Sequence, residues 1–268
     1  MGTILDALAA HARERAEAAK AVCPPGKMRE AAFERARAER QDARFLFERR
    51  LARPGMNFIC ECKKASPSKG LIAPDFPYLQ IAKEYEAAGA AAISVLTEPK
   101  WFLGSDRYLR EIAETVSVPV LRKDFTVDPY MIYEAKVLGA GAVLLICSLL
   151  TAEEIEVYIR IADSLGMSAL VEAHDEEELS KAVAAGARVI GVNNRNLKDF
   201  TVDIHNSIRL RKLAPADTLF VAESGIRTAA DIAELKENGV NGVLIGETLM
   251  RAPEKRRVLK ELGGEQYG

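Results

Sequence analysis

Glu61 and Lys63 place an acid and a base two residues apart in an otherwise apolar segment, residues 58–63. Side chains alternate across a β-strand, so residues i and i+2 point to the same face. A loop rich in Ser, Pro, Lys and Gly follows directly, at residues 64–70. The pair is therefore aimed in one direction where a strand becomes a loop, an arrangement suited to exchanging protons with a bound molecule.

The rest of the chain must build a fold around this strand end. From residue 58 onward, apolar strand-like segments alternate with helical segments. We predict eight strands, near residues 58, 91, 118, 142, 168, 188, 218 and 242. We predict helices over residues 75–88, 105–115, 128–138, 151–165, 175–185, 203–213, 228–238 and 253–262.

Four joints between a helix and the next strand repeat one pattern, with glycines at Gly89, Gly139, Gly186 and Gly239. Glycine here is typical of a left-handed helix C-cap. The intervals of 50, 47 and 53 residues correspond to about two strand–helix units each. Eight units predict an α/β fold, a closed (β/α)8 TIM barrel. An open doubly wound sheet is the alternative, but no G-x-G-x-x-G motif follows any strand.

Residues 1–55 are predicted to form an N-terminal helical extension to a barrel of residues 56–268, together one domain. Thr3 can cap a first helix over residues 4–20, with Asp6 three residues later. A Pro-Pro-Gly segment ends that helix. A second helix, about 28–51, carries many charges and an apolar seam of Met28, Ala32, Phe33, Phe45 and Leu46.

The composition limits the partners. The 268 residues are 49% hydrophobic with a net charge of −2, and acids and bases are interspersed, so we expect neither a nucleic-acid nor a membrane partner. The N-terminus is too charged for a signal peptide, and no apolar run reaches transmembrane length. The cysteines lack metal-site spacing and fit a reduced, cytoplasmic setting. They are Cys23, Cys60, Cys62 and Cys147.

The C-terminal ends of barrel strands carry the active site in this class of fold. Lys123, Glu172 and Asn193 stand at such ends, as Glu61 and Lys63 do. A barrel interior is otherwise aliphatic, so charges that point inward must be paired or functional. Close packing of such charges is also how enzymes tune pKa values for acid and base roles.

The last two strand ends predict an anion site. Ser224 and Gly225 precede a helix beginning near Thr228, and Gly246 precedes a short helical stretch, 247–251. Backbone N–H groups at such turns and helix starts bind anions, and this is the usual phosphate site of the barrel class. The Glu247 backbone can serve a phosphate if its carboxylate points away.

Other side chains near the strand ends have plainer interpretations. Trp101 and Phe102 could pack their own loop or stack on a planar ligand. Arg122 could face the helix layer or solvent, and Asp124 could pair with Lys123 or cap a turn. His174 and His205 are expected at loop or helix-start positions.

The segment Glu61-Cys62-Lys63-Lys64-Ala65-Ser66-Pro67-Ser68-Lys69-Gly70 resembles the signature of the indole-3-glycerol-phosphate synthase family. Segments 121–125, 171–174, 191–195, 222–226 and 244–247 are similar to the same family, and the resemblance covers almost the whole chain. It implies a lyase of tryptophan biosynthesis that uses no metal or organic cofactor. Its substrate would be 1-(2-carboxyphenylamino)-1-deoxyribulose 5-phosphate, which undergoes ring closure, decarboxylation and dehydration to indole-3-glycerol phosphate. The protein would be a monomer or a weak homo-oligomer.

The resemblance also implies residue roles. Lys123 would be the general acid, its pKa lowered by Lys63 and partial burial, and Glu172 the general base. Lys63 would bind the substrate carboxylate, and in some accounts it is the acid of the dehydration. Glu61 and Asn193 would orient these groups. Polar support and ring packing would come from Ser66, Arg195, Phe102, Phe125, Leu144, Leu197 and Leu244. The phosphate would be held mostly by the backbone of Ser224, Gly225, Gly246 and Glu247, the last of which is Ser in some relatives.

Two other functions suit a phosphate-binding barrel. A sister enzyme such as phosphoribosylanthranilate isomerase would use a Cys and an Asp, but Cys60 and Cys62 alternate away from Glu61 and Lys63. A binding protein without catalysis would not need both lysines and both glutamates. The loop 66–70 is predicted to be a mobile flap over the site.

Overall fold

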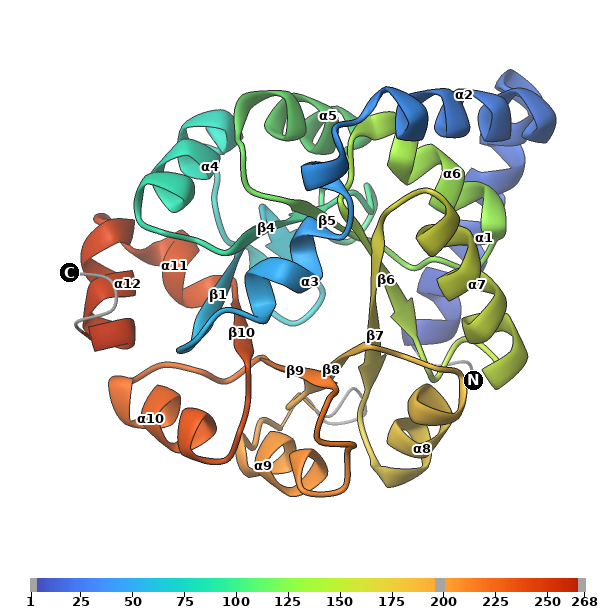
Figure 1. The fold of residues 1–268 in the computed structure, drawn as a ribbon. Helices are drawn as coiled ribbons and strands as arrows, with labels where there is room; N and C mark the ends of the chain where they lie inside the picture. Colours follow the sequence, from blue (N-terminus) through green and yellow to red (C-terminus); the bar gives the residue numbers. More distant parts are fainter. Residues whose placement is uncertain (1–3, 196–200, 265–268) are drawn as a thin grey trace.

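The fold of a computed structural model, which describes residues 4–195 and 201–264, is a closed barrel of eight parallel strands ringed by helices (Figure 1). The strands pair in the order β1-β10-β9-β8-β7-β6-β5-β4. They are β1 Asn57–Cys62, β4 Ala92–Leu96, β5 Val120–Lys123, β6 Ala142–Ile146, β7 Ser168–Ala173, β8 Val189–Asn193, β9 Leu219–Glu223 and β10 Gly242–Ile245. The predicted (β/α)8 barrel is confirmed, and the open sheet is excluded because β1 pairs with both β4 and β10.

Helices follow the strands at nearly the predicted bounds. Several begin where a Ser, Thr or Asp side chain accepts a backbone N–H of the first turn, which fixes their start. They are α4 Tyr78–Ala87, α5 Asp106–Thr115, α6 Pro129–Leu138, α7 Ala152–Ser164, α8 Glu176–Ala184, α9 His205–Arg211, α10 Ala229–Glu237, α11 Glu247–Arg251 and α12 Lys255–Gly263. None of the helices in the described ranges is long and apolar enough to cross a membrane.

The four repeated glycines end helices as predicted. Gly89, Gly139, Gly186 and Gly239 all have a positive φ, between 79° and 97°. A side chain would strain that backbone, so glycine lets the chain turn from helix into strand within a few residues. The pattern recurs at a nearly constant interval because these turns precede β4, β6, β8 and β10, every second strand of the barrel.

Alternation along each strand divides the apolar side chains into two layers. Ile59 and Leu121 pack inside the barrel, whereas Cys60 and Cys62 pack between barrel and helices. The cysteines therefore face the helix layer, as their parity predicted, and burial raises the pKa of both thiols. The same alternation turns the side chain of Glu61 into the barrel, where Glu61 is buried with 3% of its surface exposed.

The N-terminal extension differs from the prediction at one place. The helix predicted over 28–51 is wrong as a continuous element: α2 Pro25–Ala38 is followed by a 3-10 turn, η1 Gln41–Ala43, and then by α3 Leu46–Leu51. The helix ends at Ala38 because Glu39 and Arg40 adopt extended backbone, with ψ of 145° and 147°. Phe45 then breaks the path into α3 with a left-handed φ of 51°. The break swings α3 across the end of the barrel where the strands begin (Figure 1).

Helix α3 closes that end by burying Phe47 and Leu51 against Ile59 and Val189. Burial of such a side chain contributes about 1.5–3 kcal/mol. Asn57 secures the helix by donating to Leu51 O at 3.1 Å. This tertiary gain outweighs the local preference for one long helix.

Helix α1 Ile4–Val22 docks near the opposite end, where the strands finish. The proposed Thr3 cap lies outside the described residues. Arg15 donates to both carboxylate oxygens of Asp124, at 2.6 and 3.0 Å, and Thr97 donates to one of them. Burial alone would raise the pKa of Asp124, but Arg15 outweighs it and holds the pKa below its usual value. The predicted pairing of Asp124 with Lys123 is therefore wrong.

Arg122 takes the first of its two predicted places, the helix layer. Its guanidinium is 2.8 Å from Asp106 and 2.8 Å from Glu134, so it ties β5 to α5 and α6. The neighbouring Lys123 points the other way, into the barrel, because side chains alternate along β5. A rigidly anchored strand thus presents Lys123.

Candidate active site

A cavity of about 530 Å³ opens at the C-terminal ends of the strands. Its size suits a small organic ligand. Helix α1 contributes Ile4, Leu5 and Leu8 to the wall, so the extension is part of the cavity. Of the predicted site residues, Leu197 lies outside the described residues. The others all line the cavity: Glu61, Lys63, Ser66, Phe102, Lys123, Phe125, Leu144, Glu172, Asn193, Arg195, Ser224, Gly225, Leu244, Gly246 and Glu247.

The pair that begins the signature forms one wall. Lys63 Nζ lies 2.5 Å from Glu61 Oε1, and Ser94 Oγ donates to the other carboxylate oxygen at 3.5 Å. Gly246 backs the pair closely: a Cβ at this position would come within 2.4 Å of Glu61 Oε1 and 2.9 Å of Lys63 Nζ. A Cβ at this position would therefore push the ends of the Glu61 and Lys63 side chains away, whereas the backbone φ of −115° is open to any residue.

Replacing Gly246 with Ala should displace the Glu61–Lys63 pair and lower turnover, on the order of 100-fold, because misplacing catalytic groups by about 1 Å has that effect. Gly26→Ala is the matched control, since a Cβ there meets nothing within 4 Å. Steady-state rates and circular dichroism of both variants test this. Equal activity of the two proteins would show that the close approach is unimportant.

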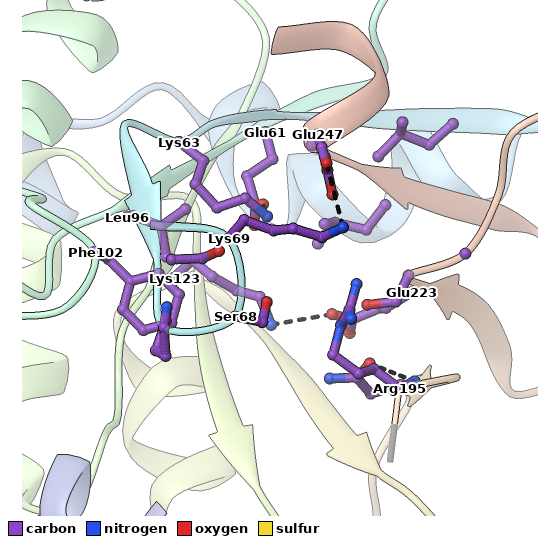
Figure 2. Close-up of a pocket in the computed structure, with 18 of the residues that line it drawn as sticks. Glu61, Lys63, Ser68, Lys69, Leu96, Phe102, Lys123, Arg195, Glu223 and Glu247 are labelled. Atoms are coloured by element: carbon purple, nitrogen blue, oxygen red, sulfur yellow. Dashed lines mark hydrogen bonds and ion pairs between the residues drawn. The ribbon is translucent and has the colours of Figure 1, made fainter. Parts of the chain in front are cut away.

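Lys123 stands at the centre of the charged cluster. Its Nζ donates to Glu223 Oε2 at 3.0 Å (Figure 2) and to Glu172 Oε2 at 2.7 Å. The Lys123 side chain is 14% exposed. Burial alone would lower the pKa of Lys123, but the two carboxylates outweigh it and raise the pKa. The expectation of a lowered pKa is wrong, because Lys63 is engaged by Glu61 and two anions face Lys123 instead.

The two carboxylates that flank Lys123 differ in their ionisation. Burial would raise the pKa of Glu172, but Lys123 and His174 outweigh it and lower the pKa. Asn193 Nδ2 also donates to Glu172 Oε1, at 3.3 Å. Glu223 has a raised pKa because it is buried and faces Glu172. The wall therefore holds one ionised carboxylate and one that is readily protonated near neutral pH.

Glu223 is the residue that the sequence pattern did not assign to the site. It ends β9 as Glu172 ends β7, and this shared inward position at a strand end is the signal that could have identified it. Among the described residues, no donor reaches Glu223 Oε1. Gly191 leaves it room, since a Cβ there would approach that oxygen to 2.3 Å.

An aromatic pair forms the apolar side of the cavity. The rings of Phe102 and Phe125 are 6.1 Å apart, and both line the cavity. Trp101 does not line it but packs edge-on against His11 of α1, at 5.6 Å. Glu98 holds this loop by accepting the backbone N–H groups of residues 100–102 at 2.7–3.0 Å. Trp101 therefore takes a packing role, whereas stacking of Phe102 on a planar ligand stays a prediction.

The opposite end of the cavity is suited to an anion. Ser224 and Gly225 have φ values of 67° and 85°, and a Cβ on Gly225 would come within 2.4 Å of Val202. Three cationic side chains line this end as well: Lys69, Arg227 and Arg251.

Glu247 lies among these cations. Its carboxylate is 3.2 Å from Arg251 and 3.7 Å from Lys69, which extends from the flap toward it (Figure 2). The carboxylate is therefore neutralised by cations rather than turned out of the cavity. A phosphate in this place would compete with Glu247 for Lys69.

The predicted flap, residues 66–70, lies within a small hairpin formed by β2 Ala65–Ser66 and β3 Gly70–Leu71. Ala65 N donates to Phe102 O at 3.2 Å, which connects the hairpin to the aromatic loop. Residues 66–69 line the cavity. Movement of this hairpin stays a prediction.

The described residues hold no group of three or more His, Cys, Asp or Glu side chains that could bind a metal ion.

Comparisons with known proteins identify the family of this chain. The family model described as indole-3-glycerol phosphate synthase matches residues 5–262. The indole-3-glycerol phosphate synthase of Ruminiclostridium cellulolyticum is 62% identical over 220 residues, which cover 82% of this chain and 85% of that protein. That of Lachnoclostridium phytofermentans is 59% identical over 219 residues, 82% of this chain and 81% of that protein.

A more distant likeness concerns the fold alone. The structure of 3-hexulose-6-phosphate synthase from Salmonella typhimurium superposes with a TM-score of 0.64 at 15% identity, covering 79% of this chain and 98% of that chain. The barrel is thus shared widely, whereas the family match spans nearly the whole sequence. The chain belongs to the indole-3-glycerol phosphate synthase family, the decarboxylating lyases of tryptophan biosynthesis.

Proposed function

We propose that Lys123 is the general acid and Glu172 the general base with which this chain converts 1-(2-carboxyphenylamino)-1-deoxyribulose 5-phosphate into indole-3-glycerol phosphate, carbon dioxide and water. The observation that carries the proposal is the position of Lys123 Nζ, 2.7 Å from Glu172 and 3.0 Å from Glu223 at the cavity wall. An ammonium held there can donate a proton into the space where a ligand binds.

Ring closure needs an acid first. The aromatic carbon attacks the carbonyl carbon, and the carbonyl oxygen takes a proton from the ammonium of Lys123. Glu223 lies 3.0 Å from the resulting amine and, because its pKa is raised, can return a proton to it. The raised pKa of Lys123 favours the charged form before each attack.

Decarboxylation then restores the aromatic ring. The carbon–carbon bond to the carboxylate breaks, its electron pair returns to the ring, and carbon dioxide leaves. Lys63 is the cation for this carboxylate, oriented by Glu61 at 2.5 Å, and Ser66 and Arg195 also line the cavity. A fixed cation orients the group without being consumed.

Dehydration completes the reaction. Glu172, kept ionised by its lowered pKa, accepts a proton from the ring CH2 carbon beside the nitrogen, and the hydroxyl leaves as water with a proton from a lysine, so that the carbon–carbon double bond of the indole forms. Asn193 holds the Glu172 carboxylate. Lys63 and Lys123 both line the cavity, so either can supply this proton. The pH–rate profiles of variants at each position would show which lysine is the acid of the dehydration.

The substrate is seated by its two ends. Phe102, Phe125, Leu144 and Leu244 offer an apolar slot for the anthranilate ring, and we include Leu197 in this set. The phosphate meets the backbone of Ser224, Gly225, Gly246 and Glu247, with the charge of Lys69, Arg227 and Arg251 nearby.

A spectroscopic assay tests the function. On mixing the folded protein with the substrate, anthranilate fluorescence should fall, indole absorbance should rise, and one carbon dioxide should appear per indole. Phosphoribosylanthranilate is the control and should give no change. A folded sample that leaves the first substrate unaltered would overturn the proposal.

A further inference from the structure

We propose that His174 and Glu178 form a partly buried couple that positions Glu172 and presents a positive charge to it, an inference that rests on the role proposed for Glu172. His174 follows β7 directly, one residue beyond its end. Its sequence position suggested an ordinary loop residue. Its contacts indicate a part in the reaction of the same site.

The ring of His174 is held on its outer side by helix α8. Nδ1 lies 3.0 Å from Glu178 Oε2, and the backbone N–H of His174 donates to the same oxygen at 2.8 Å. Asn206 of α9 donates to the His174 carbonyl at 3.0 Å. The side chains of His174 and Glu178 are 17% and 16% exposed. The ring therefore has little freedom to turn away.

The inner side of the ring faces the proposed base. His174 Nε2 lies 3.5 Å from Glu172 Oε1 and is buried, and no described residue is within hydrogen-bond geometry of it. Asn193 approaches the same carboxylate oxygen, whereas Lys123 takes the other. Three groups from three elements thus surround the Glu172 carboxylate and fix its plane.

The charges around the ring favour an imidazolium. Glu178 from α8, Glu172 from β7 and Glu223 from β9 face the ring within the described structure, and Lys123 binds the other carboxylate oxygen of Glu172. Burial would lower the pKa of His174, but these carboxylates outweigh it and raise the pKa. In the imidazolium both ring nitrogens carry a proton, so Nδ1 donates to Glu178 while the charged ring lies with Nε2 3.5 Å from Glu172 Oε1.

The order of the charges explains the function of the couple. The charged ring of His174 lies between two carboxylates, with Glu172 on its Nε2 side and Glu178 on its Nδ1 side. An opposite charge at this distance lowers the pKa of a carboxyl group, by about one unit or more. The couple therefore helps Glu172 to stay a base although Glu223 and burial oppose its ionisation.

His174→Asn tests the inference. We expect kcat to fall about tenfold through poorer positioning, with KM changed less than about twofold. The acid limb of the kcat–pH profile should move to higher pH by about one unit, because the pKa of Glu172 rises when the cation is lost. Glu178→Gln should move it the same way by less. His205→Asn, an exposed histidine on α9, is the control and should match the wild type.

A second readout is independent of activity. The chain has three histidines, so nuclear magnetic resonance signals can be assigned by single replacements. The pKa of His174 should lie above that of a free imidazole and fall in Glu178→Gln. A folded His174→Asn protein with the wild-type pH profile, or a His174 that titrates no higher than free imidazole, would overturn the couple. A wild-type protein that fails to turn over substrate would overturn the proposed function instead, and the titration would still decide the charge on the ring.

Discussion

Lys123→Met should abolish turnover while the barrel stays folded. Methionine keeps the length and apolar stem of lysine but has no proton to give to the carbonyl oxygen. General acid catalysis contributes about 10²–10⁴-fold, and we expect the upper end of that range because ring closure cannot bypass the step. Loss of anthranilate fluorescence in a single turnover measures the effect, and circular dichroism reports the fold.

The control for this variant is Lys100→Met, an exposed lysine of the neighbouring loop that does not line the cavity. It should be fully active. Lys63→Met adds a comparison, because binding of the carboxylate and proton donation affect different steps. Near-wild-type turnover of Lys123→Met would show that the acid has been assigned to the wrong residue.

Glu172→Gln should separate the reaction into its parts. Glutamine keeps the shape and can accept a hydrogen bond from Lys123, but it cannot take a proton. Ring closure and release of carbon dioxide should continue, whereas indole formation should slow by about 10²–10⁴-fold. Carbon dioxide released from a labelled carboxylate and indole absorbance, followed in one sample, would then differ in amount.

The pH dependence gives a second test of the same variant. In the wild type, the lowered pKa of Glu172 keeps the base ionised at neutral pH, and activity should fall as the pH drops through that pKa. Glu172→Gln should lack this limb. Glu177→Gln, exposed on the same helix as Glu178, is the control. Equal rates of carbon dioxide and indole formation in Glu172→Gln would contradict the assignment of the base.

The elements of the barrel could be predicted because their causes are local. Glycines such as Gly139 end helices through their own φ, and strand alternation sends Glu61 inward and Cys60 outward without reference to distant residues. The helix predicted over 28–51 failed for the opposite reason. Its break at Phe45 is stabilised by burying Phe47 and Leu51 against strands far along the chain.

The charged site shows the same division. The residue types at the strand ends followed from the sequence by itself, and they predicted an acid–base site with an anion site beside it. The pairing of these side chains could not be predicted from the sequence. Closure of the barrel brings Glu223 to Lys123, and the docking of α1 brings Arg15 to Asp124, 109 residues away in the sequence. The sign of the Lys123 pKa shift also depends on which charges lie within about 4–6 Å, and only the tertiary structure sets those distances. The sequence determined which groups reach the cavity, and the packing of the barrel decided which of them hold protons.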